Sequence, residues 1–332
     1  MAISIDDIKK LRAMTGAGLA DVKKALTEAE GDFDKAKELL RERGLAIAAK
    51  RSDRETSNGC VLTKAVNGFA ATIALKCETD FVANGADFIA LTQAILDAAI
   101  AAKAKDIEAV KELTLADGQK VQEAVTQRSG ITGEKMELDG YLTLEGENIE
   151  VYNHMGKNTL CTMVQTNKPA AEQGHLVAMQ VAAMKPVALD AASVDQKILD
   201  EEYKTSFEKT KLEQVEKFVE MKLKKAGLNP NLVDSEDHIE SNTKKGWLTP
   251  EQAEEARNIK KTVSEEKAAS LNPTMIQNIA NGRLAKFFKE NCLVDQEFQF
   301  GDGDKQTVAQ YLASQSKDLK IVAYKRFTLA AE

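Results

Sequence analysis

The sequence predicts an α+β fold built from several modules, and three observations support this class. Stretches with the alternating pattern of strands occur in two places, and each is followed by a stretch of helical period. Long charged stretches with only a thin apolar stripe occupy much of the region after residue 193. The chain of 332 residues is 29% charged and 5% aromatic, a composition typical of helix-rich proteins with solvated faces. Its length suffices for two or three domains.

Residues 1–54 are expected to form a three-helix module with a linker. Gly16 and Gly31 mark the ends of the first two helices, and Gly44 marks the end of the third. The stretch 46–58 turns polar and basic, which predicts the linker. The mildly basic balance of the module suits either an acidic helix of a partner or a solvated face. The expected apolar stripes are Ile5, Ile8 and Leu11, then Val22, Leu26 and Ala29, then Phe33, Ala36, Leu39 and Leu40.

Residues 55–140 are expected to form the first α+β half of a core domain. Asn67-Gly68 stands between two strands and is favoured in type I′ hairpins, because both residues tolerate positive φ. The second strand ends at Cys77. A helix is expected over 87–103, followed by a broken helical region over 106–128.

Residues 141–192 are expected to form a second, related half of the core. A three-stranded meander begins at Tyr141 and turns at Gly146 and Gly156, and a helix follows from about Gly174. The order of strands followed by a helix thus occurs twice, which indicates two related parts of one core domain.

Residues 193–271 are expected to form a projecting antiparallel helical hairpin. A capping box of Ser193 and Gln196 predicts the start of its first helix. Thr249-Pro250, with Gln252 as the capping-box partner of Thr249, predicts the start of the second. Between the two helices, the Gly-, Pro- and Asn-rich stretch 227–246 is expected to be a loop.

Residues 272–332 are expected to add a C-terminal helix and a return strand that pack on the core. Asn272-Pro273 predicts the start of the helix, and the apolar stretch Leu319–Leu329 predicts the strand. A turn is expected at 301–304, where glycine and aspartate alternate.

Composition and motifs argue against several classes of function. The net charge of −7 and pI near 5.4 lack the basic footprint of nucleic-acid binding, so no direct nucleic-acid partner is expected. No apolar run approaches 18 residues and the N-terminus lacks a signal segment, so we expect a cytoplasmic protein without a membrane partner. Neither GxxxxGK[ST], CxxC nor HExxH occurs, so no enzyme activity, metal site or cofactor is expected. The four cysteines are expected to be reduced core residues, namely Cys60, Cys77, Cys161 and Cys292.

The stretch Ala74–Phe88 combines a strand end, a capping cluster and an aromatic residue. Alternation up to Cys77 predicts the strand, and Glu78-Thr79-Asp80 is suited to capping a following helix. Phe81 comes directly after this cluster. It either folds back into a local core, as most aromatics beside turns do, or is displayed for a partner on a turn between two rigid elements.

A resemblance to a known family favours display. The sequence CETDFVAN, followed by DFIAL, closely resembles the signature of the bacterial translation elongation factor Ts family. The N-terminal pattern LRAMTGAGLADVKKAL and the C-terminal pattern GRLAKFFKENCLVDQEF resemble the same family, so the resemblance covers nearly the whole chain. It implies a ubiquitin-associated-like N-terminal module, a coiled-coil protrusion, and a non-enzymatic guanine nucleotide exchange factor. The implied partner is elongation factor Tu, in its GDP-bound and nucleotide-free states.

The resemblance also implies three contact sites. Thr79, Asp80, Phe81 and Val82 match the segment that enters the partner near its Mg²⁺ site and helps to dislodge the ion. His154, with Met155 beside it, matches a turn that presses near the phosphate-binding region of the partner. In the N-terminal module Arg12 and Lys23 match the family pattern, and Leu19 stands where a bulkier methionine is common.

Two alternatives of other classes remain. The chain is an adaptor scaffold if it binds partners through the module of residues 1–45 and leaves nucleotide release untouched. It is a thiol-dependent enzyme if Cys77 is a reactive nucleophile, which requires an accessible thiol with a lowered pKa.

Overall fold

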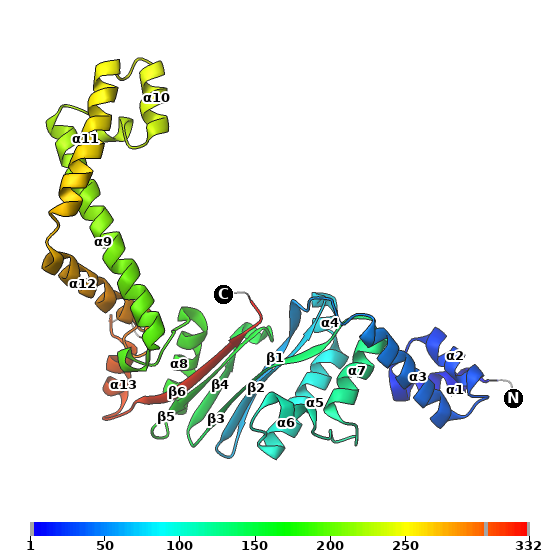
Figure 1. Ribbon diagram of the computed structural model, residues 1–332. Helices are drawn as coiled ribbons and strands as arrows, with labels where there is room; N and C mark the ends of the chain where they lie inside the picture. The colour runs from blue at the N-terminus through cyan, green and yellow to red at the C-terminus, as the bar shows by residue number, and fades with distance from the viewer. Residues whose placement is uncertain (1–2, 302–304, 331–332) are drawn as a thin grey trace. The chain divides into compact units, whose positions relative to one another are not determined.

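The structure is a computed structural model that describes residues 3–301 and 305–330. It divides into two compact units, which we name the core unit (1–189 with 297–332) and the hairpin unit (190–296). Both units are drawn in Figure 1. Helices and small antiparallel sheets together confirm the α+β class. Most of the turn expected at 301–304 lies outside the described residues.

Three helices begin the core unit: α1 (Ile5–Thr15), α2 (Leu19–Glu28) and α3 (Phe33–Ala49). They enclose a small core of their own that includes the fully buried Leu11 and Leu26. The assignment of Ile5 to the apolar stripe is wrong, because its side chain is 72% exposed. It stands in the first turn of α1, where the capping box of Ser4 and Asp7 begins the helix and Ile3 and Ile8, rather than Ile5, pack against the core of the module.

The expected end of the third helix at Gly44 is also wrong, because α3 continues to Ala49 and takes in the first part of the expected linker. Helix α7 (Val121–Thr132) packs against α3. A Cβ placed on Gly130 of α7 would lie 2.3 Å from the Cα of Gly44. The two backbones therefore touch without side chains between them, and Gly44 serves a helix contact rather than a helix end.

The first sheet of the core unit contains β1 (Asn58–Val66), β2 (Phe69–Cys77) and β3 (Glu137–Glu145), all antiparallel and in that order. The expected hairpin is confirmed, since Asn67 and Gly68 have φ of 48° and 76°. Helices α5 (Ala86–Ala102), α6 (Ile107–Lys111) and α7 cover one face of this sheet (Figure 1).

The second sheet contains β4 (Ile149–Asn153), β5 (Leu160–Thr166) and β6 (Ile321–Thr328), with α8 (Ala171–Met184) on its outer face. The meander expected from Tyr141 is therefore wrong in its first strand, because β3 pairs with β2. The pairing of β3 extends along β2 from Phe69 to Lys76, which completes the first sheet. The chain then crosses at Gly146, whose N–H donates to the Gly68 carbonyl at 2.9 Å, into the second sheet.

The inner faces of the two sheets pack on each other, so the order of layers is helices, sheet, sheet, helix. Strand β2 is consequently buried on both faces. Its inner face carries small residues such as Ala70 and Ala74, which let the sheets approach. At Gly140 of β3 a Cβ would lie 2.4 Å from the ring of Phe327 on β6, so only glycine fits opposite that ring.

The hairpin unit consists of α9 (Gln196–Lys225), α11 (Pro250–Ala269) and α12 (Pro273–Asn291), with a short 3₁₀ turn (Pro230–Leu232) and α10 (Glu236–Lys244) between α9 and α11. Helix α9 packs against both α11 and α12. The capping box at Thr249 and the start at Asn272-Pro273 are confirmed. The first helix, however, is capped by Asp195, while Ser193 donates to Asp190 instead.

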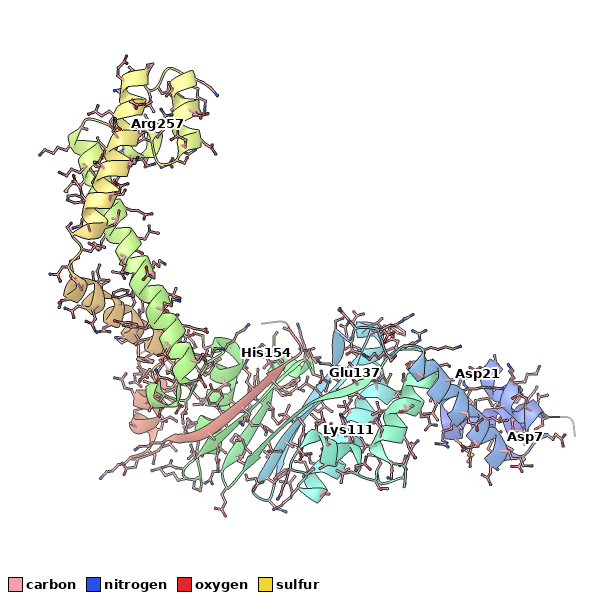
Figure 2. The ribbon with its side chains drawn as sticks, in the orientation of Figure 1. Asp7, Asp21, Lys111, Glu137, His154 and Arg257 are labelled. Atoms are coloured by element: carbon pink, nitrogen blue, oxygen red, sulfur yellow. The ribbon has the colours of Figure 1, made fainter. Side chains whose placement is uncertain are left out.

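The loop expected at 227–246 is folded rather than irregular. Helix α10 packs on α11, and Arg257 of α11 (Figure 2) donates to Glu236 of α10 at 2.8 Å. A small apolar core fills this end of the hairpin unit: Val219, Leu223, Leu228, Val233, Ile239, Leu248, Ala253 and Ala256. The apolar residues here are sparse and lack one long period, which is why composition alone suggested a loop.

The C-terminal segment also differs from the expectation of a single piece on the core. Helix α12 belongs to the hairpin unit, where it packs on α9. Helix α13 (Val308–Gln315) and strand β6 belong to the core unit. In the same way the expected boundary at 140/141 falls inside β3.

Candidate functional site

The segment after β2 forms a single helical turn, α4 (Asp80–Ala83). Thr79 is its N-cap, and its Oγ1 accepts from the N–H of Val82 at 3.3 Å. The cluster of polar residues after Cys77 therefore ends the strand and begins the turn, as the sequence predicts. Gly59 lets β1 begin beside this strand end, since a Cβ there would lie 2.4 Å from the Leu75 carbonyl oxygen.

The turn displays an aromatic ring and a carboxylate side by side. Phe81 is 87% exposed, more than any other large apolar residue of the described chain, and Asp80 is exposed as well. Val82 points the other way and packs against the core of the first sheet. The alternative that Phe81 folds back into a local core is wrong. We name residues 79–82 the Phe81 turn.

The carboxylate of Glu134, which follows α7, supports the Phe81 turn from a distant part of the sequence. One of its oxygens accepts from the hydroxyl of Thr79 at 2.6 Å. The other accepts from the backbone N–H groups of Thr79 and Glu78, at 3.1 and 3.2 Å. Reasoning from the sequence missed Glu134, because nothing in its local pattern points to a partner 55 residues away.

Glu78 fixes the other side of the same turn. Its carboxylate accepts from the backbone N–H of Lys135 at 2.6 Å and forms ion pairs with Arg54 at 2.8 Å and Arg51 at 3.5 Å. The Lys135 hydrogen bond, followed by the Arg54 guanidinium, lowers the pKa of Glu78 below its ordinary value. Asn58 of β1 adds a hydrogen bond to the Glu78 carbonyl at 2.9 Å. The exit of β2 is thus held by groups from three other segments.

The second predicted contact is a short 3₁₀ turn over His154–Gly156, which we name the His154 turn; Figure 2 labels His154. Met155 is 69% exposed and has a left-handed φ of 54°. The hydroxyl of Tyr152 lies 3.3 Å from Nδ1 of His154. The N–H of Asn158 donates to the Asn153 side chain at 3.2 Å, so all these side-chain contacts are local.

The third predicted contact lies on the N-terminal module. Arg12 and Lys23 are exposed, and Leu19 is 58% exposed although it is apolar. The sequence analysis did not single out Met14, which is 53% exposed on the same short helix as Arg12. These residues lie on the surface of α1 and α2, helices that pack around a core of their own.

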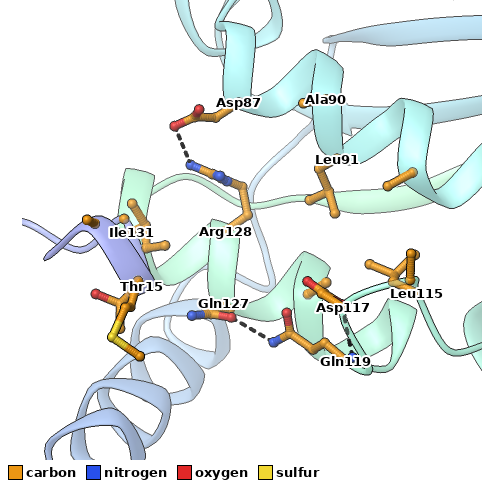
Figure 3. Close-up of a pocket in the computed structure, with 16 residues that line it drawn as sticks. Thr15, Asp87, Ala90, Leu91, Leu115, Asp117, Gln119, Gln127, Arg128 and Ile131 are labelled. Carbon is orange, nitrogen blue, oxygen red and sulfur yellow. Dashed lines mark hydrogen bonds and ion pairs between the residues drawn. The ribbon is translucent and has the colours of Figure 1, made fainter. Parts of the chain in front are cut away.

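A cavity of about 470 Å³ separates the end of α1 from α5 and α7 (Figure 3). Arg128 and Asp87 form an ion pair across it at 3.1 Å, and Gln119 donates to Gln127 at 2.6 Å. The polar lining groups thus satisfy one another, and the remaining lining is largely apolar.

The cysteines do not form a reactive site. All four are buried and free. Burial, and then the charge of Glu134, raises the pKa of the Cys77 thiol to about 12, so this thiol is protonated near neutral pH. Among residues 3–301 and 305–330, no group of three His, Cys, Asp or Glu side chains is arranged to hold a metal ion. In the same part of the chain, no helix is long and apolar enough to cross a bilayer.

Comparison with known protein families finds a match over most of the chain. A family described as Elongation factor TS matches residues 78–331, a match that begins at Glu78 and includes the Phe81 and His154 turns. The chain belongs to the elongation factor Ts family. An elongation factor Ts from Bacteroides fragilis is 59% identical over 333 positions, and one from Phocaeicola vulgatus is 58% identical over 332 positions. An elongation factor Ts from Porphyromonas gingivalis is 41% identical over 333 positions.

Each of these three alignments covers 100% of both chains, so the hairpin unit and the N-terminal module are included. Membership in the elongation factor Ts family gives the chain a role in translation elongation.

Proposed function

We propose that the chain is a guanine nucleotide exchange factor that accelerates GDP release from elongation factor Tu and catalyses no chemical reaction itself. The observation that carries the proposal is the 87% exposure of Phe81 beside the exposed Asp80, on a turn whose backbone is fixed. An aromatic ring that a rigid support holds in water makes few contacts with its own protein. It gains apolar contacts when it enters a partner.

In the proposed mechanism, which we name the wedge mechanism, the ring of Phe81 enters the GTPase near its Mg²⁺ site. Mg²⁺ demands near-ideal octahedral ligands, so a shift of about 1 Å in the elements that hold it weakens its binding. The carboxylate of Asp80 competes for the hydrogen bonds of the same ligands. Once the ion leaves, the phosphate charge of GDP is no longer compensated, and the nucleotide dissociates faster.

The energies required are of the right size. A thousandfold faster release corresponds to about 4 kcal/mol off the barrier. One buried aromatic anchor with its surrounding contacts contributes about 2 to 4 kcal/mol at an interface. The coupling is reciprocal, so bound nucleotide weakens the exchange factor as much as the exchange factor weakens the nucleotide. The exchange factor therefore binds the GDP-bound and nucleotide-free GTPase in turn, and fresh nucleotide expels it.

The His154 turn and the N-terminal module supply two further contacts in this proposal. His154 and the exposed Met155 press on the GTPase near its phosphate-binding region. Arg12, Leu19 and Lys23 hold a helix of the GTPase and so contribute affinity rather than release. This division predicts that changes in the module raise the concentration needed for half-maximal exchange, whereas changes at Phe81 lower the maximal rate.

The deciding experiment measures the release of fluorescent GDP from elongation factor Tu with the Phe81→Ala variant. We expect stimulated release to fall at least tenfold while the far-UV circular dichroism and thermal midpoint stay unchanged, because Phe81 makes little contact with its own protein. Val187→Ala, another exposed apolar residue of the core unit, is the matched control and retains full activity. Release at the wild-type rate with Phe81→Ala would refute the wedge mechanism.

A further inference from the structure

Glu134 is built into the end of α7 so that its carboxylate meets the Phe81 turn. Gly133 caps α7 with a left-handed φ of 69°, which turns the chain back toward β2. The hydroxyl of Ser129 donates to the Glu134 carbonyl at 2.5 Å, and the Glu134 N–H donates to the hydroxyl of Thr132 at 3.3 Å. The backbone of Glu134 is therefore fixed before its side chain makes any contact.

The Phe81 turn needs such support because it lacks the usual means of fixing itself. Helix α4 has only four residues, and a single helical turn is unfavourable in isolation. The ring of Phe81, 87% exposed, contributes little packing. The backbone N–H groups of Glu78 and Thr79 lie where the chain leaves the strand, and both donate to the Glu134 carboxylate. The Glu134 side chain thus accepts hydrogen bonds from both backbone N–H groups at the start of the turn.

We propose that Glu134 is a positioning residue for nucleotide exchange, one that acts by holding the Phe81 turn and makes no contact with the GTPase. This inference rests on the function proposed above and adds a residue outside the 79–82 segment. Without Glu134, the strand exit and the cap at Thr79 loosen, and the ring samples many orientations. Ordering the ring again on binding then costs entropy, which slows release.

Two substitutions at Glu134 separate the effect of its hydrogen bonds from the effect of its charge. In a Glu134→Gln variant, the amide oxygen accepts from both backbone N–H groups. The amide NH₂ donates to the hydroxyl of Thr79, which has a free lone pair besides the one that accepts from Val82. Glutamine therefore keeps a hydrogen bond at each of the three contacts, with the direction of the one to the Thr79 hydroxyl reversed, and removes the charge, whereas alanine keeps none.

The test compares Glu134→Ala, Glu134→Gln and Glu145→Ala for stimulated release of fluorescent GDP. Glu145 is an exposed carboxylate at the opposite end of β3 and serves as the control. We expect release to be about tenfold slower with Glu134→Ala and within twofold of wild type with the other two. The free Glu134→Ala protein should also lose hydrogen-exchange protection at the amides of Glu78 and Thr79, a readout that needs no partner.

A double variant separates this inference from the proposed function. In a Phe81→Ala background, Glu134→Ala should change release by less than twofold, because there is no ring left to position. The positioning role is overturned if the two effects multiply, or if Glu134→Ala alone exchanges at the wild-type rate while Phe81→Ala does not. If Phe81→Ala alone exchanges normally, the wedge mechanism fails instead.

If Glu134→Ala does not fold, Ser129→Ala replaces it in the same comparisons, because it removes the hydroxyl that fixes the Glu134 backbone and leaves residues 79–82 unchanged.

Discussion

The Phe81 turn and the His154 turn each place an apolar side chain in water at the end of a strand, yet they are held in different ways. The Phe81 turn has right-handed helical geometry and depends on Glu134 and Glu78, whose partners lie 24 to 57 positions away in sequence. The His154 turn has a left-handed residue, Met155, and side-chain contacts within five positions. The side-chain hydrogen bonds of the first come from distant segments, and those of the second come from neighbouring residues, while a backbone hydrogen bond from the Val61 N–H to the Asn158 carbonyl at 2.7 Å joins the end of the second to β1.

This difference teaches that two exposed apolar side chains can be supported in different ways. A group that must push on a partner needs a support that does not yield, and several long-range hydrogen bonds to one side chain provide one. A turn whose side chains bond only to neighbouring residues has less support of this kind. In the proposed mechanism, the Phe81 turn therefore displaces the ligand, and the His154 turn fills space beside it.

The largest effect should come from removing both side chains at once. Phe81→Ala is expected to slow stimulated GDP release at least tenfold, and Met155→Ala about threefold. Because the two turns belong to different sheets and share no hydrogen bond within the described structure, their effects should multiply to about thirtyfold. Rates that fall no further in the double variant than with Phe81→Ala alone would show that both turns act on one step.

Glycine substitutions should affect the stability of the two turns with opposite sign. Met155→Gly relieves a left-handed backbone and should stabilise the protein by about 1 kcal/mol. Phe81→Gly places glycine in a helical turn and should destabilise it by up to about 1 kcal/mol. Urea unfolding monitored by circular dichroism measures both. A shift of the same sign for the two variants would contradict the comparison.

The smallest effect concerns pH. The pKa of Glu78 is lowered in the folded protein, so its contribution to stability is present above the ordinary value of 4.5 and is lost as the pH falls through the lower folded value. Amide protection of Val82 and Ala83, which donate to Thr79, should therefore decrease below about pH 4.5. The amide of Asn158 donates to an asparagine side chain that does not titrate, so its protection provides the internal control.

Local features of the fold could be predicted from the sequence. The hairpin at Asn67-Gly68, the cap at Thr79 and the capping box at Thr249 depend on neighbouring residues only, and each is present. The CETDFVAN motif also identified Phe81 as a candidate contact residue, although the residues alone left open whether its ring was packed or displayed.

Features that depend on distant contacts could not be predicted. Gly44 looked like the end of a helix, but its role is set by Gly130 on another helix. Strand β3 was assigned to the wrong sheet, because its pattern fits either sheet and only the pairing with β2 decides. Glu134 was missed for the same reason, since no local pattern shows that its carboxylate faces Thr79.

The contact between Gly140 and Phe327 has a consequence for synthesis on the ribosome. Strand β6 follows every other described strand, and its ring occupies the space over Gly140 where the two sheets meet. Until β6 has been translated, β5 has an open edge on that side and the interior between the sheets is incomplete. A nascent copy of this translation factor therefore gains its finished interior only after β6, the last of the described strands, has been made.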